Sequence, residues 1–120
     1  KKESSPDKMI DAYIDTCFYW VANFKDHSRV WLGFLHRCSY NKHHRALNTS
    51  AVQTGEERIE AIIKLGIDRK LFRKKNSAVV AKDLQIFITG ALISMGTEDL
   101  ADPKQFLEQM KSRCLSLVAD

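Results

Sequence analysis

Five stretches of the chain repeat apolar residues at three- and four-residue steps, the spacing that gathers them on one face of an α-helix. The first begins at Pro6, which suits the first turn of a helix, with Ser5 before it as a good N-cap. The spacing predicts a helix from there to about Asn23. Its apolar face comprises Ile10, Ile14, Cys17, Val21 and Phe24, widened by Tyr13, Phe18 and Trp20.

A second series predicts a helix between Asp26, a capping candidate, and the polar cluster Ser39-Tyr40-Asn41. Its apolar residues are Val30, Trp31, Phe34, Leu35 and Cys38. A third and longer series starts near His43 and comprises Leu47, Ala51, Val52, Ile59, Ile62, Ile63 and Leu65. Gly55 weakens the middle of this helix by about 1 kcal/mol relative to alanine, so we expect a kink or a break near it. Gly66 falls in its last turn, and Phe72 in the basic loop that follows is expected to fold back onto the core.

Residues 78–95 are apolar on almost every side, unlike the other series. Asn76 or Ser77 is the expected N-cap, and Gly96-Thr97 ends the helix. So little polar surface requires cover on more than one side, and in a small domain a second subunit supplies part of it. A fifth helix opens with Asp102-Pro103. Its apolar stripe is Phe106, Leu107, Met110, Cys114, Leu117 and Val118. The pattern predicts one all-α domain over residues 1–120, built from five helices joined by short loops.

The composition excludes several classes of protein. The chain is 44% hydrophobic and 28% charged, with two prolines and five glycines, which indicates a folded domain and neither a disordered nor a fibrous one. We expect no apolar run to reach the roughly 18 residues that span a bilayer, and hence a soluble protein. Three widely spaced cysteines favour a reducing cytoplasm. Because the chain starts at Lys1 rather than at a methionine, we expect it to be part of a longer protein.

The polar residues offer little for catalysis, metal binding or direct nucleic-acid recognition. The net charge of +4 comes largely from two short runs, 42–45 and 69–75, which are typical of solvated surfaces and lack interleaved aromatic residues. The four histidines and three cysteines show no recognised metal-ligand spacing. His36 and Cys38 are two residues apart on a helix, so they point to different sides. We therefore expect no catalytic residue, no metal and no cofactor.

The first two predicted helices are rich in aromatic side chains: Tyr13, Phe18, Tyr19, Trp20, Phe24, Trp31, Phe34 and Tyr40. Two interpretations stay open. The residues can form a filled aromatic core. They can also line an apolar cavity with a few polar contacts, as small-molecule sites usually do.

The segment from Ile62 to Phe72, with the glycine-isoleucine pair Gly66-Ile67, resembles the C-terminal half of TetR-family transcriptional regulators. In that family a long helix ends in a Gly-Ile turn, a basic loop carries a phenylalanine, and an apolar helix follows, as Asn76, Ala81, Leu84 and Gly90 follow here. The likeness covers most of the chain in helix order and is specific over about thirty residues. Lys70 stands where the family commonly has a glycine.

The resemblance implies an effector-binding and dimerisation domain of a TetR-like regulator, whose DNA-reading helix-turn-helix is absent from this chain. The last two long helices would form a four-helix-bundle interface in a homodimer, and the helices before them an effector pocket. The pocket residues expected from the helix faces are Cys17, Trp20, Phe24, Trp31, Phe34, Leu35, Cys38, Ile62 and Phe87. The interface residues expected are Val80, Leu84, Phe87, Ala91, Phe106, Met110, Cys114 and Leu117.

The expected function is to bind a small apolar or aromatic molecule that shifts the DNA affinity of the missing domain. DNA would be contacted only through that domain, and no membrane is involved. The alternative is a helical protein-interaction module with a filled core and no ligand.

Overall fold

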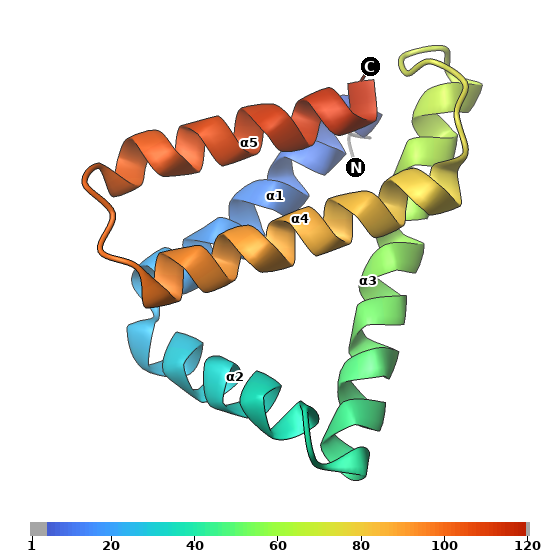
Figure 1. Ribbon diagram of the computed structural model, residues 1–120. Helices are drawn as coiled ribbons and strands as arrows, with labels where there is room; N and C mark the ends of the chain where they lie inside the picture. The colour runs from blue at the N-terminus through green and yellow to red at the C-terminus, as the bar shows by residue number, and fades with distance from the viewer. Residues whose placement is uncertain (1–4, 120) are drawn as a thin grey trace, which may run out of the picture.

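The chain folds into five helices in the order that the sequence predicts (Figure 1). The computed structural model describes residues 5–119, apart from the side chains of residues 21, 22 and 25, so Lys1 to Ser4 and the side chain of Val21 lie outside the description. Helices are the regular secondary structure throughout that range. Their bounds are Pro6–Asn23 (α1), Lys25–Cys38 (α2), Lys42–Asp68 (α3), Ser77–Thr97 (α4) and Pro103–Ala119 (α5).

Short polar side chains begin three of the helices by accepting backbone N–H groups that have no partner inside the helix. Asn41 Oδ1 accepts from the backbone of His44 at 3.0 Å and begins α3. Asn76 does the same for α4, and Asp102 Oδ1 accepts from the backbone of Gln105 at 3.0 Å at the start of α5. The caps predicted at positions 76 and 102 are therefore confirmed.

The start of α2 differs from the prediction. The chain leaves α1 at Phe24, which is itself the N-cap of α2, so Asp26 lies inside the first turn and caps nothing. Its carboxylate instead faces Arg29 Nη1 at 3.4 Å, with both side chains exposed. Phe24 alone connects α1 to α2. There is therefore no separate turn between the two helices in which Asp26 could act as the N-cap.

Helix α3 runs without a break through Gly55, so the break expected there is wrong. A methyl group at position 55 would lie 3.2 Å from Gln85 Oε1 and 3.4 Å from the Tyr13 hydroxyl, which shows that α1 and α4 both pack against this turn. A helical glycine costs only about 1 kcal/mol. Packing from two neighbouring helices outweighs that cost.

The main core lies where α1, α4, α5 and the C-terminal half of α3 meet. It comprises Ile10, Ile14, Phe18, Ile59, Ile63, Phe72, Ala81, Leu84, Ile88, Ala91, Met110, Cys114 and Val118. Helix α2 contributes none of these residues. It packs on the ends of α1, α3 and α4 and forms one side of an open triangle of helices in Figure 1. The Cα radius of gyration, 15.2 Å, accordingly exceeds the value of about 13.6 Å expected for a compact domain of this length.

The end of α3 explains how the basic loop returns to the core. Leu71 N–H donates to the carbonyl of Gly66 at 2.8 Å, and Lys70 N–H donates to that of Ile67 at 3.0 Å, the pair of bonds of a Schellman motif. Lys70 occupies the left-handed position of the motif, with φ of 61°. The motif turns the chain so that Phe72 is buried over Gly66, as the sequence predicts.

Helix α4 is long and apolar enough, by length and composition alone, to cross a membrane, with a mean hydropathy of 1.5 over 18 residues. The expectation that no stretch reaches that length is therefore wrong. The helix packs against each of the other four helices, and its Ala81, Leu84 and Ile88 are buried in the core. The core helix of a globular domain can pass the same hydropathy test, but only 22% of this window of α4 is buried inside the fold, so one side of the helix is left uncovered.

Candidate functional site

The residues predicted to bind a ligand fall into separate groups in the structure. Trp20 and Trp31 meet edge to face, with ring centroids 6.1 Å apart and an angle of 86° between the rings. Both side chains are half-buried, so the contact between α1 and α2 keeps part of each indole accessible. Phe24 is 44% exposed at the junction of the two helices. Trp20 and Trp31 thus form the centre of the predicted aromatic site.

Other members of the predicted set lie around this pair or away from it. Phe34 turns toward His44 on α3, with ring centroids 5.6 Å apart, and Leu35 is half-buried beside it in the chain. Cys38 is buried, and its thiol donates to the backbone carbonyl of His44 at 3.4 Å. Cys17 and Ile62 are half-buried and pack against the main core.

Phe87 does not belong with the tryptophans. It lines a surface hollow with Arg113, Ser116 and Leu117 of α5. Because successive residues of an α-helix turn by about 100°, position 87 lies on a different side of α4 from Gln85, which faces α3. Phe87 is therefore reassigned from the ligand set to the outer surface of α4 and α5.

The predicted ligand set left out Tyr13, which was named only among the aromatic residues, and Gln85, and Gly55 was expected only to weaken its helix. The Tyr13 hydroxyl on α1 and the Gln85 amide on α4 approach the same point of α3, where Gly55 leaves room for both. Burial raises the pKa of Tyr13, and its interaction with Cys17 raises it further. The spacing Tyr13, Cys17, Trp20 places these three on one face of α1, which is the signal that could have found the tyrosine.

Four of the predicted interface residues are already buried inside this chain. Leu84, Ala91, Met110 and Cys114 are each 8% exposed or less and belong to the main core, so they leave the predicted interface. Helix α4, which carries Leu84 and Ala91, is apolar on almost every side, so its sequence does not say which side faces the core. Val80, Phe87 and Phe106 are half-buried and pack in part against the main core, and Leu117 is 40% exposed. These four remain in the predicted interface.

The outer surface of α4 and α5 is apolar beyond those four residues. Val79 is 53% exposed and Ile86 62%, and they lie seven positions apart on one side of α4. Gly90, one further turn along, has open space where a side chain would stand. We call Val79, Ile86, Phe87, Gly90 and Leu117 the outer α4–α5 surface.

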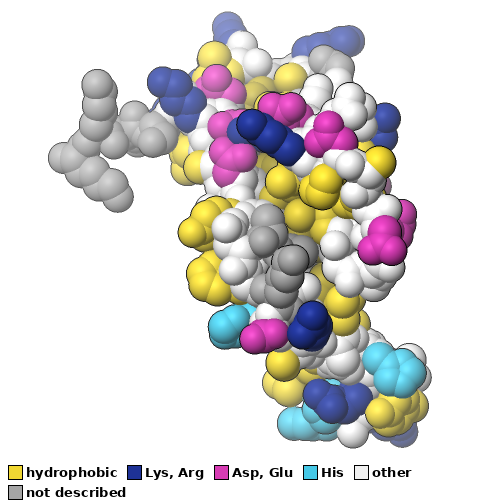
Figure 2. Space-filling view, turned by 90° about the vertical axis from the view of Figure 1, so that its left-hand side faces the viewer, with side chains coloured by type: hydrophobic (Ala, Val, Ile, Leu, Met, Phe, Trp, Pro, Cys, Tyr) yellow, Lys and Arg dark blue, Asp and Glu magenta, His cyan; other side chains and the backbone are white. Residues whose placement is uncertain are grey.

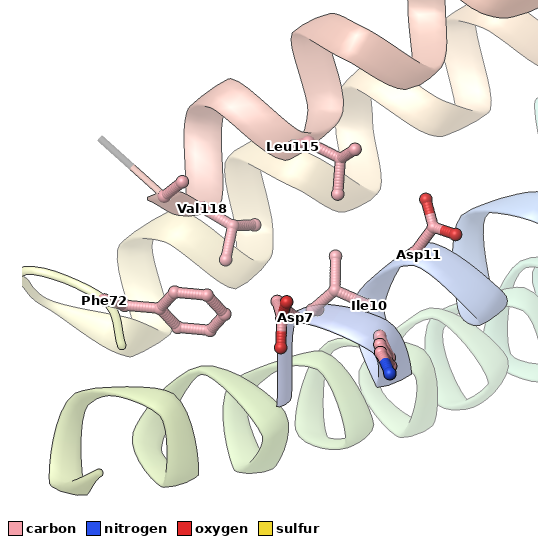
Figure 3. Close-up of a pocket in the computed structure, with 8 residues that line it drawn as sticks. Asp7, Ile10, Asp11, Phe72, Leu115 and Val118 are labelled. Carbon is pink, nitrogen blue, oxygen red and sulfur yellow. The ribbon is translucent and has the colours of Figure 1, made fainter. Parts of the chain in front are cut away.

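A cavity of about 310 Å³ opens between the start of α1, Phe72 and the end of α5. Its floor is apolar, formed by Ile10, Leu115 and Val118, and Asp7 and Asp11 stand at its rim (Figure 3). A hydrogen bond from the Ser5 side chain lowers the pKa of Asp7. None of the residues predicted to bind a ligand lines this cavity.

A second hollow of about 370 Å³ lies between α1 and α5, lined by Phe18, Tyr19 and Leu107 among charged residues. Lys111 of α5 joins the two helices beside it, at 3.1 Å from Asp11 and 2.8 Å from Asp15. These carboxylates, Asp15 first, raise the pKa of Lys111. Figure 2 shows hydrophobic side chains reaching the surface of the molecule between charged ones.

The surroundings of the cysteines and histidines decide whether these side chains could ionise or bind a metal. Burial raises the pKa of the Cys17 thiol, and that of Cys114 to about 12, so both thiols carry their protons at neutral pH. Histidine and basic side chains gather toward the narrow end of the molecule, where α2 meets α3 (Figure 2). Within residues 5–119, no three histidine, cysteine or acidic side chains are grouped as metal ligands would be.

Comparison with known proteins leaves the family open. No protein-family profile matches the chain, and no curated protein or solved structure gives a significant match. The assignment of a function therefore depends on the geometry above.

Proposed function

We propose that this chain is the effector-sensing and homodimerisation domain of a TetR-like transcriptional regulator. The observation that carries the proposal is the outer α4–α5 surface. Ile86 and Val79 expose more than half of their side chains, and Phe87 and Leu117 continue the apolar area onto α5. Lys82 and Asp83 are exposed between Val79 and Ile86 on α4, and exposed apolar side chains bordered by charged ones in this way favour an interaction site.

The occupant that fits this surface best is a second copy of the chain. Asp83 lies one turn before Phe87 on α4, and Arg113 lines the hollow beside Phe87 on α5. Both side chains are exposed, and neither forms an ion pair within the described part of the chain. In a twofold pairing, Asp83 of one copy meets Arg113 of the other, and the reverse holds as well. Gly90 lets the two α4 helices approach closely.

Helix α4 links this interface to the proposed effector site. Gln85 faces Tyr13 and Gly55 on the inner side of α4, whereas Ile86 and Phe87 belong to the outer side. A ligand that shifts α4 on its inner side therefore changes the packing of the interface. Such a ligand can shift α4 only because it binds one arrangement of the helix more tightly than the other. The coupling free energy between a ligand site and a second site is typically about 1–3 kcal/mol. The absent DNA-reading domains would respond to that change.

The second candidate function is a helical protein-interaction module with a filled core. It is favoured by the burial of Cys38 and by the packing of Cys17 and Ile62 against the core, which leaves less room for a ligand. The exposed tryptophan edges and the accessible Gln85 amide favour the effector domain instead.

Sedimentation velocity tests the proposal with a matched pair of variants. Ile86→Glu and Val30→Glu each place a charge at an aliphatic position that is more than 60% exposed, so neither disturbs the core. We expect the native chain and Val30→Glu to sediment as dimers and Ile86→Glu as a monomer. A monomeric native chain, or equal behaviour of the two variants, would contradict the proposed interface.

A further inference from the structure

Two neutral hydrogen-bonding side chains from different helices converge beside Gly55. The Gln85 amide lies 3.2–3.3 Å, and the Tyr13 hydroxyl 3.4 Å, from the place that a Cβ of residue 55 would take. An alanine at this position would be in tight contact with the amide. The glycine therefore allows α1 and α4 to bring these two polar groups together over α3.

The Gln85 amide has hydrogen-bonding capacity to spare. Its side chain has no hydrogen-bond partner among the described residues. Among the same residues, His44 Nδ1 is the single side-chain nitrogen or oxygen that is both buried and without a partner. The amide of Gln85 consequently reaches solvent. An amide offers two N–H donors and a carbonyl acceptor, so it can both give and receive hydrogen bonds.

An aromatic surface continues from this polar pair. Tyr13, Cys17 and Trp20 follow one another along one face of α1, and Trp20 meets Trp31 of α2. With a rise of 1.5 Å per residue, the backbone from position 13 to position 20 spans about 10 Å. All four side chains are half-buried. Tyr13 and Cys17 also pack against the main core, so the stripe is accessible only along one side, with the polar pair at one end and the tryptophan pair at the other.

We infer that Tyr13 and Gln85 form the specificity-determining end of the effector site, and that the ligand is a neutral aromatic molecule with a hydroxyl or carbonyl group at one end. This inference rests on the proposed effector function. The aromatic body lies along Cys17 toward Trp20 and Trp31, and the polar group exchanges hydrogen bonds with Gln85 and Tyr13. A hydroxyl or carbonyl group fits because the Gln85 amide and the Tyr13 phenol offer uncharged hydrogen-bond donors and acceptors at this point.

The probes for a test are 2-naphthol and 2-methylnaphthalene, which have the same shape and differ by a hydroxyl in place of a methyl group. Binding is followed by the fluorescence of Trp20 and Trp31, the two tryptophans of the chain. We expect the native protein to bind 2-naphthol about tenfold more tightly, the ratio that one net hydrogen bond provides. Gln85→Leu and Tyr13→Phe should each reduce that ratio several-fold, while both variants keep their helical circular dichroism.

Gln53→Leu is the matched control, because Gln53 is exposed on α3 and should leave the ratio unchanged. If both probes bind equally well to the native protein, or if Gln85→Leu keeps the preference, the polar subsite is overturned while the aromatic effector site survives. If neither probe binds, the inference is overturned together with the effector half of the proposed function. The dimer measured by sedimentation is independent of both outcomes.

Discussion

The ring of Phe72 lies against the backbone of Gly66, in the space that any side chain at position 66 would need. A methyl group there would be 2.1 Å from Cδ2 of the ring, far inside the contact distance. Both residues are buried, and the N–H groups of Leu71 and Phe72 donate to the Gly66 carbonyl. This contact fixes where α3 ends and how the loop to α4 begins.

Gly66→Ala should therefore destabilise the domain, although alanine is the better helix former. The gain in helix propensity is about 1 kcal/mol, whereas displacing a buried ring typically costs about 1–3 kcal/mol. The control is Gly33→Ala on α2, where no atom lies within 4 Å of the new methyl group and the substitution should stabilise. Urea unfolding of the two variants measures both effects. Stabilisation by both substitutions would show that Phe72 is not packed as described.

Lys70→Gly should stabilise the domain by about 1 kcal/mol. Lys70 has a φ of 61°, a conformation that costs a residue with a side chain roughly 1–2 kcal/mol and costs glycine almost nothing. Part of the gain is lost because glycine also makes the unfolded chain more flexible. Arg69→Gly, one residue earlier at a φ of −88°, should destabilise instead. Thermal unfolding of the pair tests the sign, and a lower melting temperature for Lys70→Gly would argue against the turn.

Alkaline pH should destabilise the protein in part through Cys114. Burial raises the pKa of this thiol from its ordinary value near 9.0 to about 12. Between these values the unfolded state has lost the proton and the folded state keeps it, so stability falls as pH rises, by up to about 1.4 kcal/mol per pH unit. Below about pH 9 both states hold the proton and this dependence disappears.

The comparison to make is between the native chain and Cys114→Ala, unfolded with urea at neutral pH and at about pH 10. The variant should be less stable at neutral pH, because a buried side chain is shortened, but its stability should depend less on pH. An unchanged pH dependence would indicate that the Cys114 thiol ionises as easily in the folded protein as in the unfolded chain.

Much of the fold could be read from local signals. The pairs Ser5-Pro6 and Asp102-Pro103 mark the starts of α1 and α5, and Asn76 marks that of α4, because caps act within one turn of chain. The return of Phe72 to the core also followed from an aromatic residue in a basic loop, whereas its apolar neighbour Leu71 stays exposed. Gly55 was expected to interrupt α3, but α1 and α4 pack against this turn and the helix continues through it.

The candidate sites were predictable only in part. Trp20 and Trp31 were both expected among the pocket residues, but the contact between their rings was not predicted. Phe87 was assigned to both the pocket and the interface, because a helix that is apolar on every side does not reveal which side meets which neighbour. The convergence of Tyr13 and Gln85 on Gly55 joins three helices far apart in sequence, and nothing in the sequence specifies that geometry.

The sequence alone determined the number of helices, their order and nearly all of their ends, because periodicity and capping are properties of neighbouring residues. The tertiary structure decided which sides of α4 are buried, placing Leu84 and Ala91 in the core and leaving Ile86 outside. It also decided which polar groups meet across helices. Those outcomes depend on how rigid elements pack in three dimensions, where a rotation of about 100° separates adjacent side chains.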